Sequence, residues 1–562
     1  MQLCFPCFQR AGLILLGWIT CGVPTSQPML QGAELSPKDR AIARAIDSHI
    51  AFLADDLLEG RGTGTSGYDV AARYVASHFG ALGLIPAGDS NTWYQSVPLR
   101  EGTLENERSV ISLKAGEGFQ PLTSALDFVL LPNMTEEKVE VSGSLVFVGY
   151  GVYAPELQHD DFRGVDLKGR IAVVLGSAPP RFAPTALAHH SSRMQKQEQL
   201  AVRGAVGMIS IPTPKDLEES PWPKRVAQAR FPSMRWTRAD GSPAQVFPTL
   251  KAVASISPAG AGKVFAKAPI SLQQALTAAA RGEIQNFPLN QDGVLAVKTR
   301  HRQLTSPNVL GLLRGSDPKL RNETLVLTAH LDHLGRGAAV KGDRIYNGAY
   351  DNAIGCAMIM ECMRLLAGEG RSPRRSVLAA AVTAEEKGLV GSEFLAGHPP
   401  AMAGRFVGNV NLDMVLATRP SRHVTMLGIE HSSLRDPVET AASRFGFELL
   451  PDPRPDRVAF VRSDQYSFVR NGIPAVSPKI TDLPGTRSEP GVFTPDEFVK
   501  VHYHQPSDES TLPRDEATSV RFVRFMAEVI RLAANSERPP RWNPGDFFGE
   551  TFGKTGEVQE SR

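Results

Sequence analysis

Residues 376–388, SVLAAAVTAEEKG, decide how the rest of the chain is interpreted. Residues 376–384 form a nearly continuous apolar run, which is typical of a strand covered on both faces of a parallel sheet. Two adjacent carboxylates, Glu385 and Glu386, follow directly. Two adjacent carboxylates repel each other, so the pair is an unlikely structural choice unless the two side chains have different chemical roles. The alternative is a solvated helix start, where acidic residues are favourable. The stretch therefore predicts a buried strand with a chemical site at its carboxyl end.

Strand and helix patterns alternate around this stretch. Residues 324–330, TLVLTAH, predict a short apolar strand, and residues 351–366 have apolar side chains at helical spacing. Residues 516–535 predict a closing amphipathic helix. This alternation is typical of an α/β fold with a mixed, largely parallel sheet between layers of helices. In such folds, ligands gather at the carboxyl ends of the strands.

Five residues of metal-binding type lie in order along the chain, each in its own short motif. They are His330 in TAHLDHLG, Asp351 in NGAYDNAIG, Glu386 in TAEEKG, Asp413 in NLDM and His504 in YHQPSDE. Two imidazoles and three carboxylates suit a pair of zinc ions, and Glu385 would then act as the general base towards water. Asp351 is placed to bridge two ions, but it could instead cap the helix that follows it.

Three neighbouring residues have secondary roles in this prediction. Asp332 stands two positions after His330, so on an extended backbone its side chain could orient the imidazole. The alternative is an ordinary hydrogen-bonded pair at a strand end. Tyr503 could donate a hydrogen bond to a developing oxyanion, or it could simply pack. His333 is expected to lie outside the ligand set.

The amino terminus predicts export. Arg10 precedes the apolar run AGLILLGWITCG, so residues 1–26 are expected to be a cleavable signal peptide of a secreted or periplasmic protein. A buried first helix is the alternative. A lipid anchor at Cys21 is not expected, because WITC is a poor match to a lipoprotein site. No later run approaches transmembrane length, and the net charge of +2 favours no nucleic-acid partner.

The metal motifs divide the mature chain. Residues 34–135 are expected to form the amino-terminal part of the main domain, and residues 300–536 the rest of it, which holds the motifs. Residues 139–290 contain no metal motif and are predicted to be an inserted domain. Residues 537–562 are rich in Pro and Gly, which predicts a loosely held tail. The Gly-rich loop EGRGTGTSG at 59–67 is either a connector or an edge of the site.

The motifs AHLDHLG, AYDNAIG, AEEKGLVGS, NLDM and YHQPSDE together resemble the secreted zinc aminopeptidases of metallopeptidase family twenty-eight. The block VFVGYGVYAPELQHDDFRGVDLKGRIAVVL resembles the β-rich protease-associated domain that some members carry as an insertion. The resemblance implies two Zn²⁺ ions and peptide or protein amino termini as substrates. One departure is Gln465, where relatives often have His, and this difference could alter the rim of the site.

The resemblance also implies a role for each site residue. His330 and Asp413 would bind one zinc, Glu386 and His504 the other, and Asp351 would bridge them. Glu385 would be the general base, and Asp332 would orient His330.

Rival functions stay open at this point. A carboxypeptidase, a dipeptidase or a single-zinc glutaminyl cyclase would use a similar ligand set. A non-catalytic, receptor-like protein could keep the fold, although the complete set from His330 to His504 argues against it. Serine catalysis is not indicated, because the chain has no G-x-S-x-G motif.

Overall fold

The computed structural model describes residues 35–553, except 284–285, 369, 371, 484 and 487–491. The predicted signal peptide at 1–26 lies outside the described residues. Among the residues that are described, no helix is both long and apolar enough to cross a membrane.

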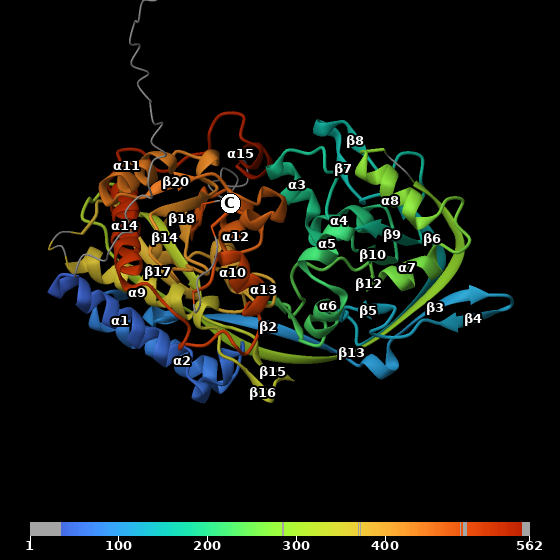
Figure 1. The fold of residues 1–562 in the computed structure, drawn as a ribbon, viewed down its shortest axis with the longest axis horizontal. Coiled ribbons are helices and arrows are strands. Elements are labelled where there is room, and N and C mark those ends of the chain that lie inside the picture. Colours follow the sequence, from blue (N-terminus) through green and yellow to red (C-terminus); the bar gives the residue numbers. More distant parts are fainter. Residues whose placement is uncertain are drawn as a thin grey trace, which may run out of the picture.

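A mixed sheet lies at the centre of the half of the molecule that carries the metal motifs (Figure 1). Its order is β11 (Ser233–Trp236), β2 (Tyr94–Leu104), β13 (Asn286–Leu313), β17 (Ser376–Val382), β14 (Glu323–His330), β18 (Arg405–Asn411) and β21 (Ala475–Ile480). The last four strands are parallel to one another, and β19 (His423–Leu427) with β20 (Glu448–Leu450) extends the sheet beyond β21. The predicted mixed, largely parallel sheet is confirmed.

Helices cover both faces of this sheet. On one face are α1 (Pro37–Leu53), α2 (Ser66–Ala81), α9 (Ile354–Gly368), α11 (Arg435–Phe445) and α14 (Glu516–Asn535). On the other are α10 (Val390–Gly397), α12 (Gln465–Arg470) and α15 (Phe547–Phe552). Successive side chains of a strand point to opposite faces. In β14, Leu325 and Leu327 accordingly belong to the first core and Val326 to the second, which explains the continuous apolar run.

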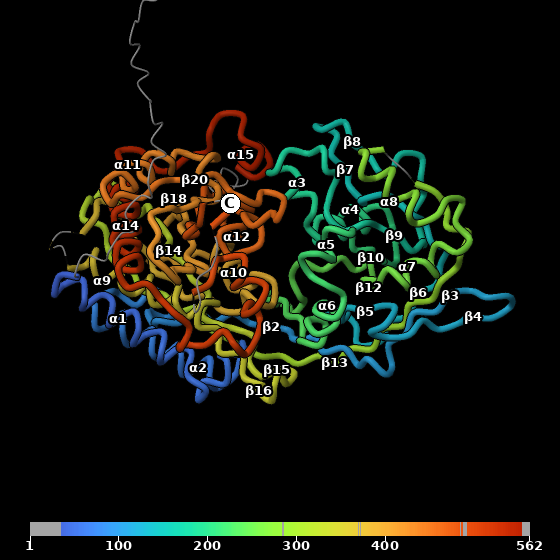
Figure 2. The backbone as a smooth tube through the Cα atoms, viewed as in Figure 1, coloured from blue at the N-terminus to red at the C-terminus, as the bar shows by residue number. Residues whose placement is uncertain are grey.

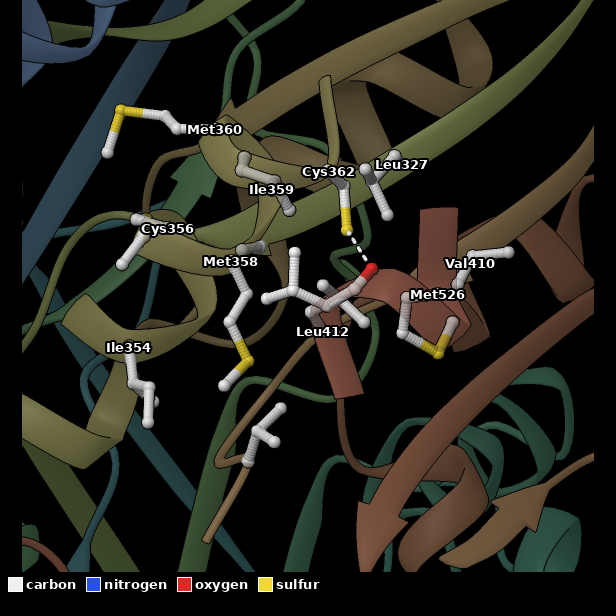
Figure 3. Packing of buried hydrophobic residues seen from close by; sticks show 14 of the residues in the cluster. Leu327, Ile354, Cys356, Met358, Ile359, Met360, Cys362, Val410, Leu412 and Met526 are labelled. Carbon is white, nitrogen blue, oxygen red and sulfur yellow. Dashed lines mark hydrogen bonds between the residues drawn. The ribbon is translucent and has the colours of Figure 1, made fainter. Parts of the chain in front are cut away.

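The first core is rich in sulfur-containing side chains (Figure 3). Met358 on α9 and Met526 on α14 are fully buried in it. Cys356 and Cys362, both on α9, are buried free thiols. The Cys362 thiol donates a hydrogen bond of 3.5 Å to the main-chain oxygen of Val523 on α14. The two helices that flank the strand ends are thus held by close apolar packing.

A second sheet forms the other half of the molecule. Its order is β4 (Gly118–Pro121), β3 (Val110–Ala115), β13, β6 (Lys138–Val148), β9 (Ile171–Leu175), β10 (Gly207–Ile211), β12 (Ala252–Ile256) and β5 (Phe128–Leu130). Its helices are α3 (Pro184–Ser191), α4 (Arg193–Val202), α5 (Pro214–Glu219), α6 (Trp222–Gln228), α7 (Pro258–Val264) and α8 (Leu272–Ala280).

Strand β13 belongs to both sheets. Residues 286–298 pair with β6 and residues 299–309 pair with β2, so one continuous strand joins the two halves (Figure 2). The core of the second half runs from Ile111 to Val297. Its sheet begins with β3, inside the range 34–135 that the sequence analysis assigns to the main domain. Long-range pairing with β13 places β3 there.

The segment after α14 packs against the rest of the protein. Phe548 on α15 is fully buried, and the Trp542 indole donates to the Gly472 carbonyl at 2.9 Å. α15 lies beside α3, where the rings of Phe547 and His189 are 5.5 Å apart (Figure 1). Residues 537–553 therefore differ from the loosely held tail that their Pro and Gly content predicts, because buried aromatic side chains anchor them.

Candidate metal centre

Parallel strands bring the predicted ligands together. His330 is the last residue of β14, Glu386 follows the end of β17 by four residues, and Asp413 follows β18 by two. These strands are neighbours in the sheet, so their carboxyl ends share one edge. Asp351 lies three residues before the start of α9, and His504 lies three residues after α13 (Pro495–Val501). All five metal ligands predicted from the sequence lie together at this edge of the sheet.

The two oxygens of Asp351 face two different groups of ligand atoms. On one side, His330 Nε2 lies 3.2 Å from Asp351 Oδ1 and 3.4 Å from Asp413 Oδ1. On the other side, His504 Nε2 lies 3.3 Å from Asp351 Oδ2 and 3.1 Å from Glu386 Oε2. This arrangement is what a carboxylate shared between two ions requires.

The chemistry of these atoms fits a metal. Asp351 Oδ2, Glu386 Oε1 and Asp413 Oδ1 are buried, and among the described residues no group meets them with hydrogen-bond geometry, although imidazole nitrogens lie near them. A buried carboxylate without a partner is costly, and ligation of a cation removes that cost. Carboxylate oxygens and imidazole nitrogens are also the donors that zinc accepts. Two groups of ligand atoms, those of His330, Asp351 and Asp413 and those of His333, Asp351 and Glu386, each fit within 4.8 Å.

His333 is closer to the site than the sequence analysis expects. Its Nδ1 lies 2.8 Å from Glu386 Oε1 and 4.0 Å from Asp351 Oδ2, and its side chain is fully buried. The second group therefore has two imidazoles, His333 and His504, beside the same carboxylates. The sequence HLDH does not reveal the position of His333, because this residue lies in the loop after the strand end. The path of that loop cannot be predicted from the sequence.

The partner of His330 also differs from the expected one. His330 Nδ1 lies 3.0 Å from the main-chain oxygen of Asp332, so the N–H donates there and Nε2 is left for a ligand. The Asp332 carboxylate instead accepts from the amide N–H groups of Glu385, at 3.0 Å, and Glu386, at 3.4 Å. The backbone leaves the extended conformation after β14 and turns the Asp332 side chain towards the end of β17. Asp332 thus positions the two glutamates.

Asp508 positions Asp351. Its carboxylate accepts hydrogen bonds from the amide N–H groups of Tyr350, at 2.9 Å, and Asp351, at 3.0 Å. Gln465 is fully buried, and its oxygen accepts from the Asn411 amide at 2.8 Å. The replacement of His by Gln at this position therefore does not change the rim of the site, because the side chain does not reach it.

The Gly-rich loop at 59–67 supports the site through a residue that sequence analysis missed. Arg61 is fully buried, and its guanidinium donates to four main-chain oxygens. These belong to Leu331, Asn347 and Gly348, which are close in sequence to the ligands, and to Leu53. Thr63 in the same loop donates to the Asp332 carboxylate at 3.1 Å. The loop is therefore an edge of the site. The one feature of the sequence that could have indicated this role is an Arg among glycines.

Replacing Arg61 with Leu is expected to lower the free energy of unfolding by about 3–5 kcal/mol, because four buried carbonyl groups lose their donor. Chemical denaturation measures this loss. Arg336→Leu is the matched control, since Arg336 is exposed and its guanidinium pairs with Glu59, at 2.8 Å, rather than with buried carbonyl groups. Its expected change is within about 0.5 kcal/mol. Equal effects of the two substitutions would contradict the role given to Arg61.

A cavity of about 530 Å³ opens beside the ligands, and Glu385 and Tyr503 line it. Burial raises the pKa of Glu385 well above its usual range, opposed by His330 and reinforced by Glu386. Burial also raises the pKa of Tyr503, so its hydroxyl stays protonated and can donate. A carboxyl group with a raised pKa and a protonated phenol thus face the same space at the edge of the ligand group.

Comparisons with known proteins agree with this geometry. Residues 308–530 match the sequence model of peptidase family M28. A probable zinc metalloprotease of Leptosphaeria maculans is 37% identical over 112 residues, which are 19% of this chain and 24% of that protein. The chain thus matches about a quarter of the length of that relative.

One solved structure shares the fold. An aminopeptidase from Aneurinibacillus sp. strain AM-1 superposes with a TM-score of 0.51 and 19% identity, over 90% of this chain and 97% of that one. BSAP, a zinc aminopeptidase from Bacillus subtilis, is more distant, with a TM-score of 0.44, 18% identity and coverage of 87% and 94%.

Proposed function

We propose, from the premise that residues 308–530 form a peptidase family M28 domain, that this protein is a two-zinc aminopeptidase. The observation that carries the proposal is the position of Asp351, whose oxygens face His330 and Asp413 on one side and His504 and Glu386 on the other. His330, Asp413 and Asp351 would hold one zinc, and Glu386, His504 and Asp351 the second.

Zinc, when bound, supplies Lewis acidity that lowers the pKa of water and polarises a carbonyl group. Glu385 removes a proton from the water that attacks the peptide carbonyl. It then delivers this proton to the leaving nitrogen as the C–N bond breaks, so a carboxylic acid and an amine are formed. Transfer of the second water proton from the acid to the amine gives a carboxylate and an ammonium group, and no proton is lost. The Tyr503 hydroxyl donates a hydrogen bond to the carbonyl oxygen as negative charge develops there. Asp332 holds Glu385 in place through its amide group.

Removal of the metals is expected to abolish turnover. A chelator should lower the peptidase rate to background, and added zinc should restore it together with about two ions per chain. Elemental analysis measures the zinc content per chain, and a peptide assay on the same sample measures the rate of hydrolysis. A chain that binds zinc yet hydrolyses no peptide would support the receptor-like alternative.

Cleavage at the amino terminus is the part of the proposal that the ligand set supports least. The Aneurinibacillus structure is that of an aminopeptidase, and it supports the choice through its fold. Tripeptides with free ends, a blocked amine or a blocked carboxyl distinguish the candidates. An aminopeptidase should cleave the carboxyl-blocked peptide and leave the amine-blocked one intact. Cleavage of the amine-blocked peptide would instead favour a carboxypeptidase.

Export and an inserted domain complete the proposal. Residues 1–26 have the charge and apolar pattern of a signal peptide, so the mature protein would begin near residue 27. Amino-terminal sequencing of the protein from culture medium or periplasm tests this. Residues 139–290 would be an insertion of the protease-associated type.

A further inference from the structure

Basic residues outnumber acidic residues in the lining of the cavity beside the ligands. Apart from Glu385 and Glu386, its lining contains one acidic residue, Glu393. The basic residues in its lining are Arg193, Arg235, Lys251, Lys387, Arg462 and Arg470. Lys251 pairs with Glu136 at 3.1 Å. In the part of the chain that the structure describes, none of the other five has a carboxylate within ion-pair distance.

These cations come from both halves of the molecule. Arg193 is the first residue of α4 in the second half, and Arg235 lies on β11, a strand of the sheet that carries the ligands. Arg462, Arg470 and Lys387 come from the half that holds the ligands. Arg235 lies beside Gly388, two residues after Glu386, because a Cβ on Gly388 would lie 3.8 Å from its Nη1. The basic wall is therefore continuous with the segment that carries Glu385 and Glu386.

The cations crowd one another. Arg193 lines the cavity, and its side chain is partly exposed. Partial desolvation there, together with the charges of Arg235 and Arg225, lowers its pKa. Burial and the charge of Arg462 likewise lower the pKa of Lys224, whose ammonium lies 5.1 Å from the Tyr503 ring centre. Repulsion of this kind costs stability, and a bound anion would relieve it.

The amino-terminal end of α4 adds to the positive electrostatic field of the cavity. Arg193 occupies the helix end at which the dipole is positive, where a basic side chain is unfavourable. Ser192 makes no side-chain capping bond there, and the first turn contains no acidic residue. Glu393 offsets part of the charge, because it lies near Arg470 and Arg235, although burial raises its pKa.

We propose that this cavity binds carboxylate groups of the peptide substrate, so that the enzyme prefers acidic peptides, with Arg193 and Arg235 as specificity-determining residues. This inference rests on the proposed peptidase function. The cavity includes Glu385, so a molecule that fills it reaches the reacting groups. Arginine forks match carboxylates in bidentate geometry. The volume of about 530 Å³ is in the range of small-ligand sites, which suits a short stretch of peptide.

Carboxyl-blocked tripeptides with Glu or Gln at each position in turn test the inference. For at least one position, kcat/KM of the zinc-loaded protein is expected to be roughly tenfold or more higher with Glu, and this ratio should fall with added salt. Arg193→Gln and Arg235→Gln should each reduce the ratio, and Arg193→Lys should retain part of it. Arg230→Gln is the matched control, because Arg230 is exposed and does not line the cavity.

The outcomes separate the two proposals. Efficient cleavage of the Gln peptides with a Glu/Gln ratio near one at every position would overturn the inference and leave the peptidase function intact. If no peptide is cleaved, the peptidase proposal fails. Calorimetric binding of the same Glu and Gln peptides then decides the inference, and equal affinities would overturn it.

Discussion

Replacing Glu385 with Gln is expected to lower kcat about 10²–10⁴-fold while the zinc content stays at two per chain. Gln is close to Glu in size and cannot accept the proton from the attacking water. Glu385 has none of the close contacts that join Glu386 to His333 and His504, so its loss should leave the ligand group intact. Steady-state kinetics and metal analysis on one preparation measure both effects.

Two controls define what this result means. Glu386→Gln should lose zinc as well as turnover, because its oxygens lie 2.8 Å from His333 Nδ1 and 3.1 Å from His504 Nε2. Glu439→Gln, on the surface of α11, should change neither quantity. Wild-type turnover in the Glu385 variant would rule out the proposed proton transfer.

Replacing Asp351 with Ala is expected to remove both metals and all measurable turnover. Loss of a residue that only supports a ligand typically lowers metal affinity about 10–100-fold. Asp351 faces both groups of ligand atoms directly, so its loss should exceed that range for each ion. Competition with a chelator of known affinity measures the change.

Asp508→Asn provides a graded comparison. The Asp508 carboxylate holds the Asp351 amide at 3.0 Å and does not face the ligand atoms, so its replacement should cost about 10–100-fold in affinity. If Asp351 only caps α9, its replacement should cost about 1 kcal/mol of stability and leave zinc binding unchanged. Full zinc content in Asp351→Ala would therefore contradict the bridging role.

The ligand positions could be predicted because each has a local signal. His330 and Asp413 come at the ends of apolar runs, and the carboxyl ends of parallel strands meet at one edge. Glu385 and Glu386 could be predicted for the same reason, because they also follow an apolar run that forms a strand.

Residues that act through distant partners could not be predicted. Arg61 contacts main-chain oxygens up to 287 residues away, and no pattern around it reveals them. The direction of the Asp332 carboxylate depends on where the loop after β14 turns. β3 joined the second sheet because it pairs with β13, which is far along the chain.

The sequence by itself determined the α/β class, the positions along the chain of the strands that carry the ligands, and the type of chemistry available at their ends. These follow from side-chain periodicity and residue type, which are local properties. Only the tertiary structure decided that Asp351 lies between two groups of ligand atoms and that Arg193, Arg235 and Arg462 face one cavity beside Glu385. Bridging and charge clustering depend on distances between remote segments, and only the packing of the two halves sets those distances.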